Sequence, residues 1–137
     1  MDFLLEKPVK GKIGIEKYKV ILEWRNGQLI SDEPLELGGK DLGPDPYTLL
    51  LASLASCTLS TLRMYIDRKE WDIPNISIEV NMYQEKMENL STTITRKIHL
   101  GNDVDELQKS RLLAIAAKCP VSKLLENKIS LESSFIN

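Results

Sequence analysis

The sequence has little cysteine and histidine, and it has no long apolar run. Its 137 residues include two cysteines, Cys57 and Cys119, and one histidine, His99. Two cysteines are too few for the disulfide framework of a small secreted domain, and neither a C-x-x-C nor an H-x-x-x-H spacing supports a metal site. We therefore expect no metal. The two thiols are either buried apolar fillers or reactive groups.

The charge balance argues against a nucleic-acid partner. Eighteen Lys and Arg residues against twenty Asp and Glu residues leave a net charge of -2, with both signs mixed along the chain, so no basic surface is expected to bind phosphates. The longest apolar run, 47–54, is far shorter than the roughly 20 residues of a membrane span. Residues 1–10 lack a signal-peptide pattern. We expect a cytoplasmic protein without a membrane partner.

The composition is that of a folded domain. Hydrophobic residues make up 42% of the chain and charged residues 28%, which is typical of a globular protein. The length suits one core, and no repeat or linker interrupts it. We predict a single domain over residues 1–137.

Alternating apolar residues predict strands in the N-terminal third. Residues 17–24 alternate, and the Asn26-Gly27 dipeptide that follows predicts a type I′ hairpin turn. The returning strand should cover 28–31. After a turn, a short third strand is predicted at 35–37.

A long helix should follow. Asp45 can cap the free N–H groups of a first turn, and Pro46 suits the first helical position because it has no N–H. We predict a helix from Pro46 to about Lys69. Its first half is apolar on nearly every side, so we expect it to be buried in the core or against another subunit.

The second half of the chain predicts a hairpin and two helices. Residues 76–83 and 92–100 alternate around a polar turn, which indicates two antiparallel strands. Asp103 and Glu106 resemble a capping box at the start of a helix. Pro120 should end that helix and begin a shorter one.

A strand over 129–135 is predicted to complete the fold. The expected order is βββ-α-ββ-αα-β, an α+β fold with a mainly antiparallel sheet around a long buried central helix.

Cys57 lies within the predicted long helix. Residues three and four positions apart share a helix face, so Cys57 belongs to a stripe of small polar groups with Ser53, Ser60 and Thr61. A free cysteine on such a helix is often an inert buried residue. The helix context alone therefore leaves its role open.

Cys119 has a more distinctive position, directly before Pro120. This is the expected N-cap of the short helix, where free N–H groups and the helix dipole lower the pKa of a thiol. Lys118 and Lys123 add positive charge nearby. The alternative is that Cys119 only fills the corner between two helices.

Three weaker patterns remain. Ser53 or Ser60 could be combined with His99 and Asp103 into a hydrolytic triad, but no Gly-x-Ser-x-Gly motif is present. The loop Gly38-Gly39-Lys40 lacks the rest of a phosphate-binding motif. Arg96 shares the apolar side of its strand, where it either meets a carboxylate or, as we favour, extends to water at the sheet edge.

The two cysteine segments resemble the OsmC/Ohr family of thiol peroxidases. The segments are Gly43-Pro-Asp-Pro-Tyr-Thr-Leu-Leu-Leu-Ala-Ser-Leu-Ala-Ser-Cys57 and Ala117-Lys-Cys-Pro-Val-Ser122. The resemblance extends from about Tyr18 to the C-terminus. It implies an OsmC-like fold over 1–137 and an intertwined homodimer with active sites at the subunit interface.

The resemblance also implies a chemistry. Family members reduce organic hydroperoxides, so Cys57 would be the peroxidatic cysteine and Cys119 the resolving cysteine that forms a disulfide with it. Arg25, in the first hairpin, would stabilise the peroxidatic thiolate. No cofactor is implied beyond an external dithiol reductant, such as a lipoylated or thioredoxin-like protein.

One departure from the family is visible. A Glu that usually positions the arginine is absent, and Tyr47 and Thr48 stand in its place. This keeps a second hypothesis open, in which the dimer binds an apolar ligand in its interface cleft with weak or no peroxidase activity.

Overall fold

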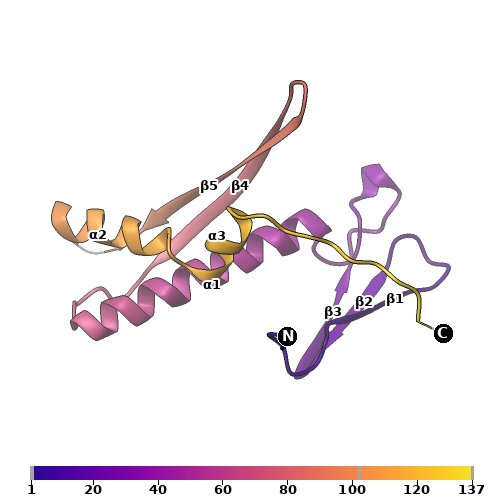
Figure 1. The fold of residues 1–137 in the computed structure, drawn as a ribbon, viewed down its shortest axis with the longest axis horizontal. Coiled ribbons are helices and arrows are strands. Elements are labelled where there is room, and N and C mark those ends of the chain that lie inside the picture. Colours follow the sequence, from indigo (N-terminus) through magenta and orange to yellow (C-terminus); the bar gives the residue numbers. More distant parts are fainter. Residues whose placement is uncertain (1, 102, 137) are drawn as a thin grey trace. The chain divides into compact units, whose positions relative to one another are not determined.

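The computed structural model describes residues 2–101 and 103–136. The chain forms two compact units, Met1–Leu50 and Leu51–Asn137. The strands, in chain order, are β1 (Lys10–Ile13), β2 (Val20–Trp24), β3 (Gly27–Ser31), β4 (Ser77–Lys86) and β5 (Leu90–His99). The helices are η1 (Leu35–Leu37), α1 (Pro46–Lys69), α2 (Glu106–Ala116) and α3 (Pro120–Leu125) (Figure 1). This mixed α+β architecture with antiparallel sheets confirms the predicted fold class.

The first unit contains a three-stranded antiparallel sheet in the order β1-β2-β3. The β2–β3 hairpin is confirmed, but its predicted turn was wrong. Trp24 pairs with Gly27, so the two loop residues are Arg25 and Asn26, and neither has the positive φ of a type I′ turn. Gly27 faces Trp24 closely, because a Cβ there would lie 2.9 Å from an indole carbon.

The predicted strand at 35–37 is also wrong. These residues form the short 3-10 helix η1, in which the Leu37 and Gly38 N–H groups bond to the carbonyls of Pro34 and Leu35, both at 3.0 Å. Three residues that satisfy their own hydrogen bonds need no partner strand. The third strand is β1, which the sequence analysis missed because Lys10–Ile13 is exposed throughout and has no apolar alternation.

A buried carboxylate organises the loop after β3. Asp32 accepts backbone hydrogen bonds from Tyr18 at 3.2 Å, Glu33 at 2.8 Å, Lys40 at 3.2 Å and Leu42 at 3.3 Å. One of these donors, Lys40, belongs to the Gly38-Gly39-Lys40 loop considered as a phosphate-binding motif, and Leu42 lies two residues beyond it. The Asp32 carboxylate accepts the hydrogen bonds of the Lys40 and Leu42 N–H groups, so it accounts for the conformation of this loop without a bound phosphate.

The helix α1 begins as predicted. Asp45 accepts the Tyr47 N–H at 3.2 Å and the Thr48 hydroxyl, which caps the first turn. The single chain does not bury α1 on all sides, since its buried residues are Leu54, Thr58, Leu62, Tyr65 and Ile66. Burial against another subunit, the other alternative, stays a prediction. Tyr47, Leu50 and Met64 are exposed by 61%, 40% and 71%, which leaves apolar surface uncovered along this helix.

α1 is long and apolar enough to cross a membrane by length and composition. Its mean hydropathy reaches 1.4 over 18 residues, and 28% of that window is buried. The longest unbroken apolar run, 47–54, is therefore a poor measure of how apolar this helix is over its whole length. The core helix of a soluble protein meets the same criterion, and here Leu62 and Ile66 are fully buried.

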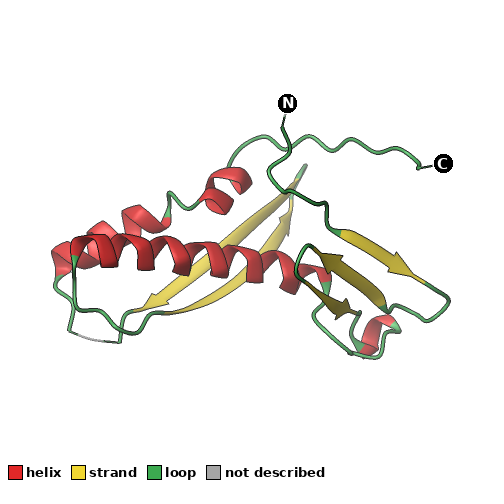
Figure 2. Ribbon diagram, turned by 90° about the horizontal axis from the view of Figure 1, so that it is seen from below, coloured by secondary structure: helices red, strands yellow, loops and turns green. Residues whose placement is uncertain are grey.

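The second unit packs α1 and α2 with the β4–β5 hairpin (Figures 1 and 2). Ile98 of β5 and Ile76 lie against the core. The buried core residues are Leu62, Tyr65, Ile66, Ile73, Val104, Leu112 and Ala116. The capping box of α2 uses Asp105 and Gln108, two positions beyond the predicted pair.

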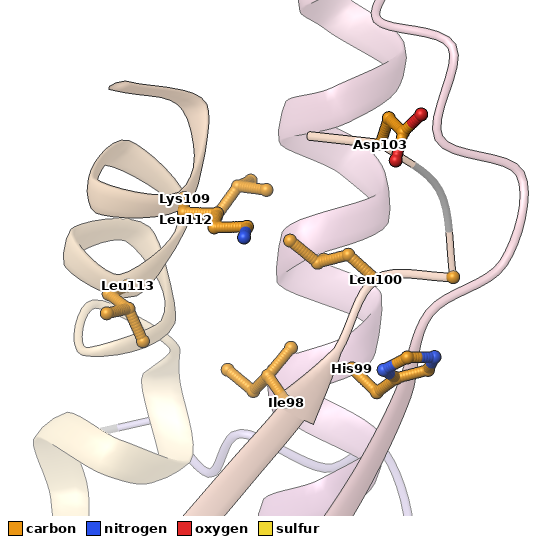
Figure 3. Close-up of a pocket in the computed structure, with 8 residues that line it drawn as sticks. Ile98, His99, Leu100, Asp103, Lys109, Leu112 and Leu113 are labelled. Carbon is orange, nitrogen blue, oxygen red and sulfur yellow. The ribbon is translucent and has the colours of Figure 1, made fainter. Parts of the chain in front are cut away.

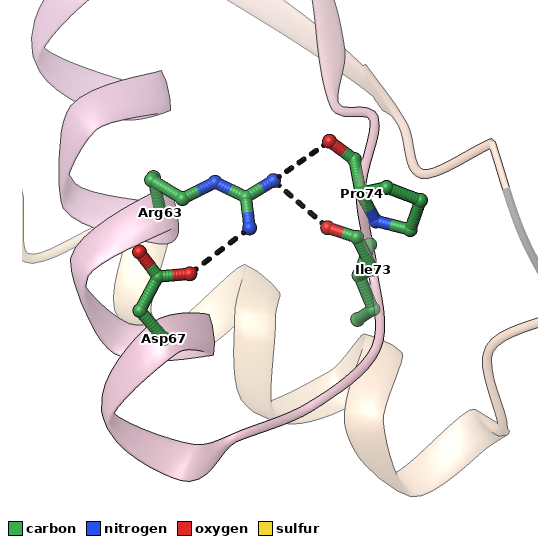
Figure 4. Close-up of polar contacts among 4 residues, drawn as sticks. All are labelled: Arg63, Asp67, Ile73 and Pro74. Carbon is green, nitrogen blue, oxygen red and sulfur yellow. Dashed lines mark hydrogen bonds and ion pairs between the residues drawn. The ribbon is translucent and has the colours of Figure 1, made fainter.

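Arg63 fixes the segment that follows α1. Its guanidinium donates to the carbonyl oxygens of Ile73 at 2.8 Å and Pro74 at 3.1 Å, and it pairs with Asp67 at 3.1 Å (Figure 4). The side chain therefore ties the C-terminal half of α1 to the chain that leads into β4.

The predicted final strand at 129–135 is wrong. Those residues have no strand structure. A strand needs a neighbouring strand to satisfy its N–H and C=O groups, and the described residues offer none to this segment. An alternating apolar pattern cannot supply that partner.

Candidate active site

Cys119 is a fully buried thiol at the N-cap of α3, which confirms its predicted place at that helix start. Its sulfur accepts a hydrogen bond from the Ser122 N–H at 3.4 Å. The Thr58 hydroxyl lies 3.7 Å from the same sulfur. The site thus joins α3 to α1, two elements far apart in sequence.

Arg96 brings a positive charge to this thiol from β5. Its Nη1 atom lies 3.9 Å from the Cys119 sulfur, and it donates to the Thr58 hydroxyl at 3.1 Å and to the Ala116 carbonyl at 3.0 Å. The predicted extension to water at the sheet edge was wrong. The guanidinium instead meets two neutral oxygens and a sulfur, so its charge has no carboxylate partner among these contacts.

Cys57 lies beside Cys119. It is half-buried on α1, and its side chain contributes to lowering the pKa of the Cys119 thiol. Of the other polar residues of its predicted stripe, Ser53 and Ser60 are exposed, whereas Thr61 is half-buried like Cys57. Thr58, the next residue along the helix, faces the interior instead and bonds back to the Leu54 carbonyl at 2.8 Å.

The environment changes the acidity of Cys119. Burial raises the pKa of its thiol, but hydrogen bonds from Ser122, Thr58 and Cys57 outweigh this effect and lower the pKa from 9.0 to about 7. A substantial fraction of Cys119 is therefore thiolate at neutral pH. The thiolate is the nucleophilic form of a cysteine, so the lowered pKa favours reactivity of this thiol.

A small pocket of about 180 Å³ adjoins the thiol site. Leu54, Ile94 and Leu125 give it an apolar lining, and Arg96 and Ser122, which both contact Cys119, belong to its wall. The pocket can hold a small apolar group next to the polar contacts of the buried sulfur.

Other predicted residues lie elsewhere. Arg25 is exposed in the β2–β3 turn of the first unit, and its role stays a prediction. Lys118 and Lys123, the cations expected to act on Cys119, are exposed. The sequence analysis missed Thr58 and Ser122 as partners of the thiol, although Thr58 directly follows Cys57.

His99 and Asp103 line a separate open pocket with Lys109 and Leu112 (Figure 3). Lys109 and Leu112 extend into it from α2. Neither Ser53 nor Ser60, the two serines considered for a hydrolytic triad, lines this pocket. The pocket therefore does not bring the three triad residues together. Within 2–101 and 103–136, no group of three His, Cys, Asp or Glu side chains is placed to hold a metal ion.

The family description of OsmC-like protein matches residues 38–134, which include both cysteines. The chain belongs to the OsmC-like family. Residues 38–134 contain α1, α2, α3 and the β4–β5 hairpin, so every contact of the Cys119 sulfur described above comes from the matched region.

Solved structures of OsmC and Ohr proteins have the same fold. An osmotic stress induced and detoxification response protein from Psychrobacter arcticus is 23% identical with a TM-score of 0.75, and 90% of this chain and 91% of that one are covered. An organic hydroperoxide resistance protein OsmC from Legionella pneumophila is 23% identical with a TM-score of 0.66, over 90% and 91% of the two chains.

The organic hydroperoxide resistance protein OhrB of Bacillus subtilis is a further structural neighbour. It is 20% identical with a TM-score of 0.65, and 89% of this chain and 91% of that chain are covered. A comparison with curated proteins gave no match.

Proposed function

We propose that this OsmC-like protein reduces organic hydroperoxides with Cys57 as the peroxidatic and Cys119 as the resolving cysteine. The observation that carries the proposal is the pairing of a half-buried thiol, Cys57, with a fully buried thiol, Cys119, whose pKa is lowered in part by Cys57. Cys57 is the more accessible sulfur and therefore suits attack on an external oxidant. Cys119 is shielded and suits reaction with its neighbour.

The proposed cycle has two oxidative steps. The Cys57 thiolate attacks the terminal peroxide oxygen, the O–O bond breaks, and the alkoxide takes up a proton to leave as an alcohol. Cys57 becomes a sulfenic acid. The Cys119 thiolate then attacks the Cys57 sulfur and displaces hydroxide, which forms the Cys57–Cys119 disulfide. An external dithiol reduces this disulfide and is itself oxidised to a disulfide.

The pocket beside the site supports an organic substrate. Its walls from Leu54, Ile94 and Leu125 can hold an alkyl or aryl group, and burying apolar area contributes roughly 25 cal/mol per Å². Two of the structural neighbours are named organic hydroperoxide resistance proteins, which agrees with this substrate class.

The remaining partners follow from the same proposal. We propose a homodimer, in which a second copy covers the exposed apolar residues of α1, including Tyr47 and Met64. Arg25 would support the Cys57 thiolate, and a dithiol protein of the cytoplasm would reduce the disulfide. Analytical ultracentrifugation tests the dimer, since a monomer at micromolar concentration contradicts it.

Rapid mixing of the reduced protein with cumene hydroperoxide tests the activity. We expect one cumyl alcohol per subunit without a reductant and repeated turnover when a dithiol is supplied. Hydrogen peroxide should react more slowly, because it has no apolar group for the pocket. Unchanged thiol content after excess hydroperoxide would overturn the proposal.

A further inference from the structure

Arg96 occupies a position that the proposed cycle does not yet use. Its Nη1 atom contacts the Cys119 sulfur at 3.9 Å and is held there by two shorter bonds, to the Thr58 hydroxyl and to the Ala116 carbonyl. The Thr58 hydroxyl in turn lies 3.7 Å from the same sulfur. The guanidinium is thus placed to act on Cys119 by its charge, and it also holds the Thr58 hydroxyl beside the same sulfur.

We propose that Arg96 is a positioning residue for the resolving step, holding the Cys119 sulfur as a thiolate beside Cys57. The inference rests on the proposed function, because it assigns Arg96 to the second oxidative step of that cycle. A cation a few Å from a thiol favours its ionised form, and the effect is strong where water is excluded. Cys119 is fully buried and Arg96 is half-buried, so solvent screens this contact only in part.

Apart from Arg96, the groups that act on the Cys119 sulfur are a hydroxyl, Ser122 and a second thiol. Cys57 and Thr58 approach it from α1, Ser122 from α3, and α2 contributes the Ala116 carbonyl that bonds to Arg96. Glu126 lines the pocket that Arg96 also lines. Its carboxylate is the one acidic group of that pocket wall within the part of the chain the structure describes.

The step assisted by Arg96 is the closure of the disulfide. The Cys119 thiolate attacks the sulfur of an oxidised Cys57, the Cys57–oxygen bond breaks, and hydroxide leaves and takes up a proton. The three contacts of Arg96 Nη1 described above go to Thr58, Ala116 and Cys119, and none of them goes to Cys57. Attack of Cys57 on the peroxide should therefore proceed without it.

An aromatic disulfide isolates the closure step from the peroxide reaction. Dithiobis(nitrobenzoate) reacts with the accessible Cys57, releasing one thionitrobenzoate anion and leaving a mixed disulfide. Cys119 then displaces the second thionitrobenzoate, whose absorbance gives the closure rate. This assay needs no peroxidase activity, so failure of the proposed function and failure of the Arg96 role are distinguishable.

The expected signature of Arg96→Gln is a crossing of two pH profiles. If the pKa of Cys119 rises by one unit, closure should be about threefold slower than wild type at about pH 6. It should become about threefold faster at about pH 9, because thiolate nucleophilicity increases with pKa. A purely structural defect slows closure at every pH.

Two variants complete the test. Arg96→Lys keeps the charge and should restore most of the wild-type profile at low pH. Lys97→Gln removes an exposed cation from the next position of β5 and should leave the profile unchanged. Parallel profiles for wild type and Arg96→Gln, or equal profiles for Arg96→Gln and Arg96→Lys, would overturn the inference.

Discussion

The guanidinium of Arg96 lies 3.9 Å from the sulfur of Cys119. The two residues belong to β5 and to the start of α3, and the contact is closed from a third side by Thr58 of α1. A buried thiol with a cation and several donors around it is unusual for a cysteine that only fills space. This cluster is the physical basis for treating the two cysteines as a reactive pair.

Exchange of each cysteine should separate the two roles. Cys57→Ser should abolish consumption of cumene hydroperoxide, because the accessible sulfur is lost. Cys119→Ser should still reduce one equivalent of peroxide and retain a sulfenic acid at Cys57, which dimedone labelling followed by mass spectrometry detects. A sulfenic acid at Cys119 in the Cys57→Ser protein would mean that the roles are reversed.

The acidified thiol should also make the stability of the reduced protein depend on pH. The pKa of Cys119 is lowered from 9.0 to about 7 in the folded chain, so its contribution is absent below the folded value. It grows as the pH rises between the two values and is complete above the unfolded one. Urea unfolding of wild type and Cys119→Ser should therefore diverge from pH 7 to pH 9, with wild type gaining stability. A constant difference contradicts the lowered pKa.

The Arg63 contacts should stabilise the second unit mainly through two carbonyl oxygens. Arg63→Met removes the bonds to Ile73 and Pro74 and should cost about 1–2 kcal/mol of unfolding free energy, because each hydrogen bond contributes on the order of 1 kcal/mol. Asp67→Asn only weakens an exposed ion pair and should cost less than about 0.5 kcal/mol. Urea denaturation measures both, and equal losses would contradict this assignment.

The Asp32 carboxylate should matter more at neutral pH than in acid. Burial raises the pKa of this carboxyl, but backbone hydrogen bonds from Glu33, Leu42, Tyr18 and Lys40 lower it overall. A lowered carboxyl pKa stabilises the fold above the unfolded value, and that stability is lost as the pH falls through the folded value.

Asp32→Asn should accordingly reduce the melting temperature at neutral pH, with a smaller difference at about pH 3, where carboxyl groups begin to protonate. Asp41→Asn is the matched control, because Asp41 is an exposed residue of the same loop with a positive φ that Asn also adopts. Equal melting temperatures for the two variants would show that the four hydrogen bonds of Asp32 do not stabilise the loop.

Local signals predicted much of the architecture. The Asp45-Pro46 start placed α1 correctly, and alternation found the β4–β5 hairpin. Cys119 at the N-cap of α3 follows from the proline after it. Errors arose where neighbours in space decide the structure. The segment 129–135 alternates, but residues 2–101 and 103–136 offer it no strand to pair with. The exposed strand β1 has no apolar alternation, but it pairs with β2.

The sequence predicted the two cysteines of the site, but not the residues that contact them. The sequence places Cys57 and Cys119 on helices, but their proximity depends on how α1, α3 and β5 pack. Arg96 shares a strand side with Ile94 and Ile98, and that pattern indicates only that its stem is covered. Which atoms its guanidinium meets depends on α1 and α2, and no spacing along the chain encodes that contact.

The central claim is that Cys57 and Cys119 form a redox pair. The most direct measurement is mass spectrometry of proteolytic peptides, without reduction, after the reduced protein has reacted with one equivalent of cumene hydroperoxide. The account predicts a single linked peptide pair containing Cys57 and Cys119, reversed by a dithiol. Recovery of both cysteines as free thiols, or of Cys57 only as sulfinic acid with Cys119 free, would contradict it.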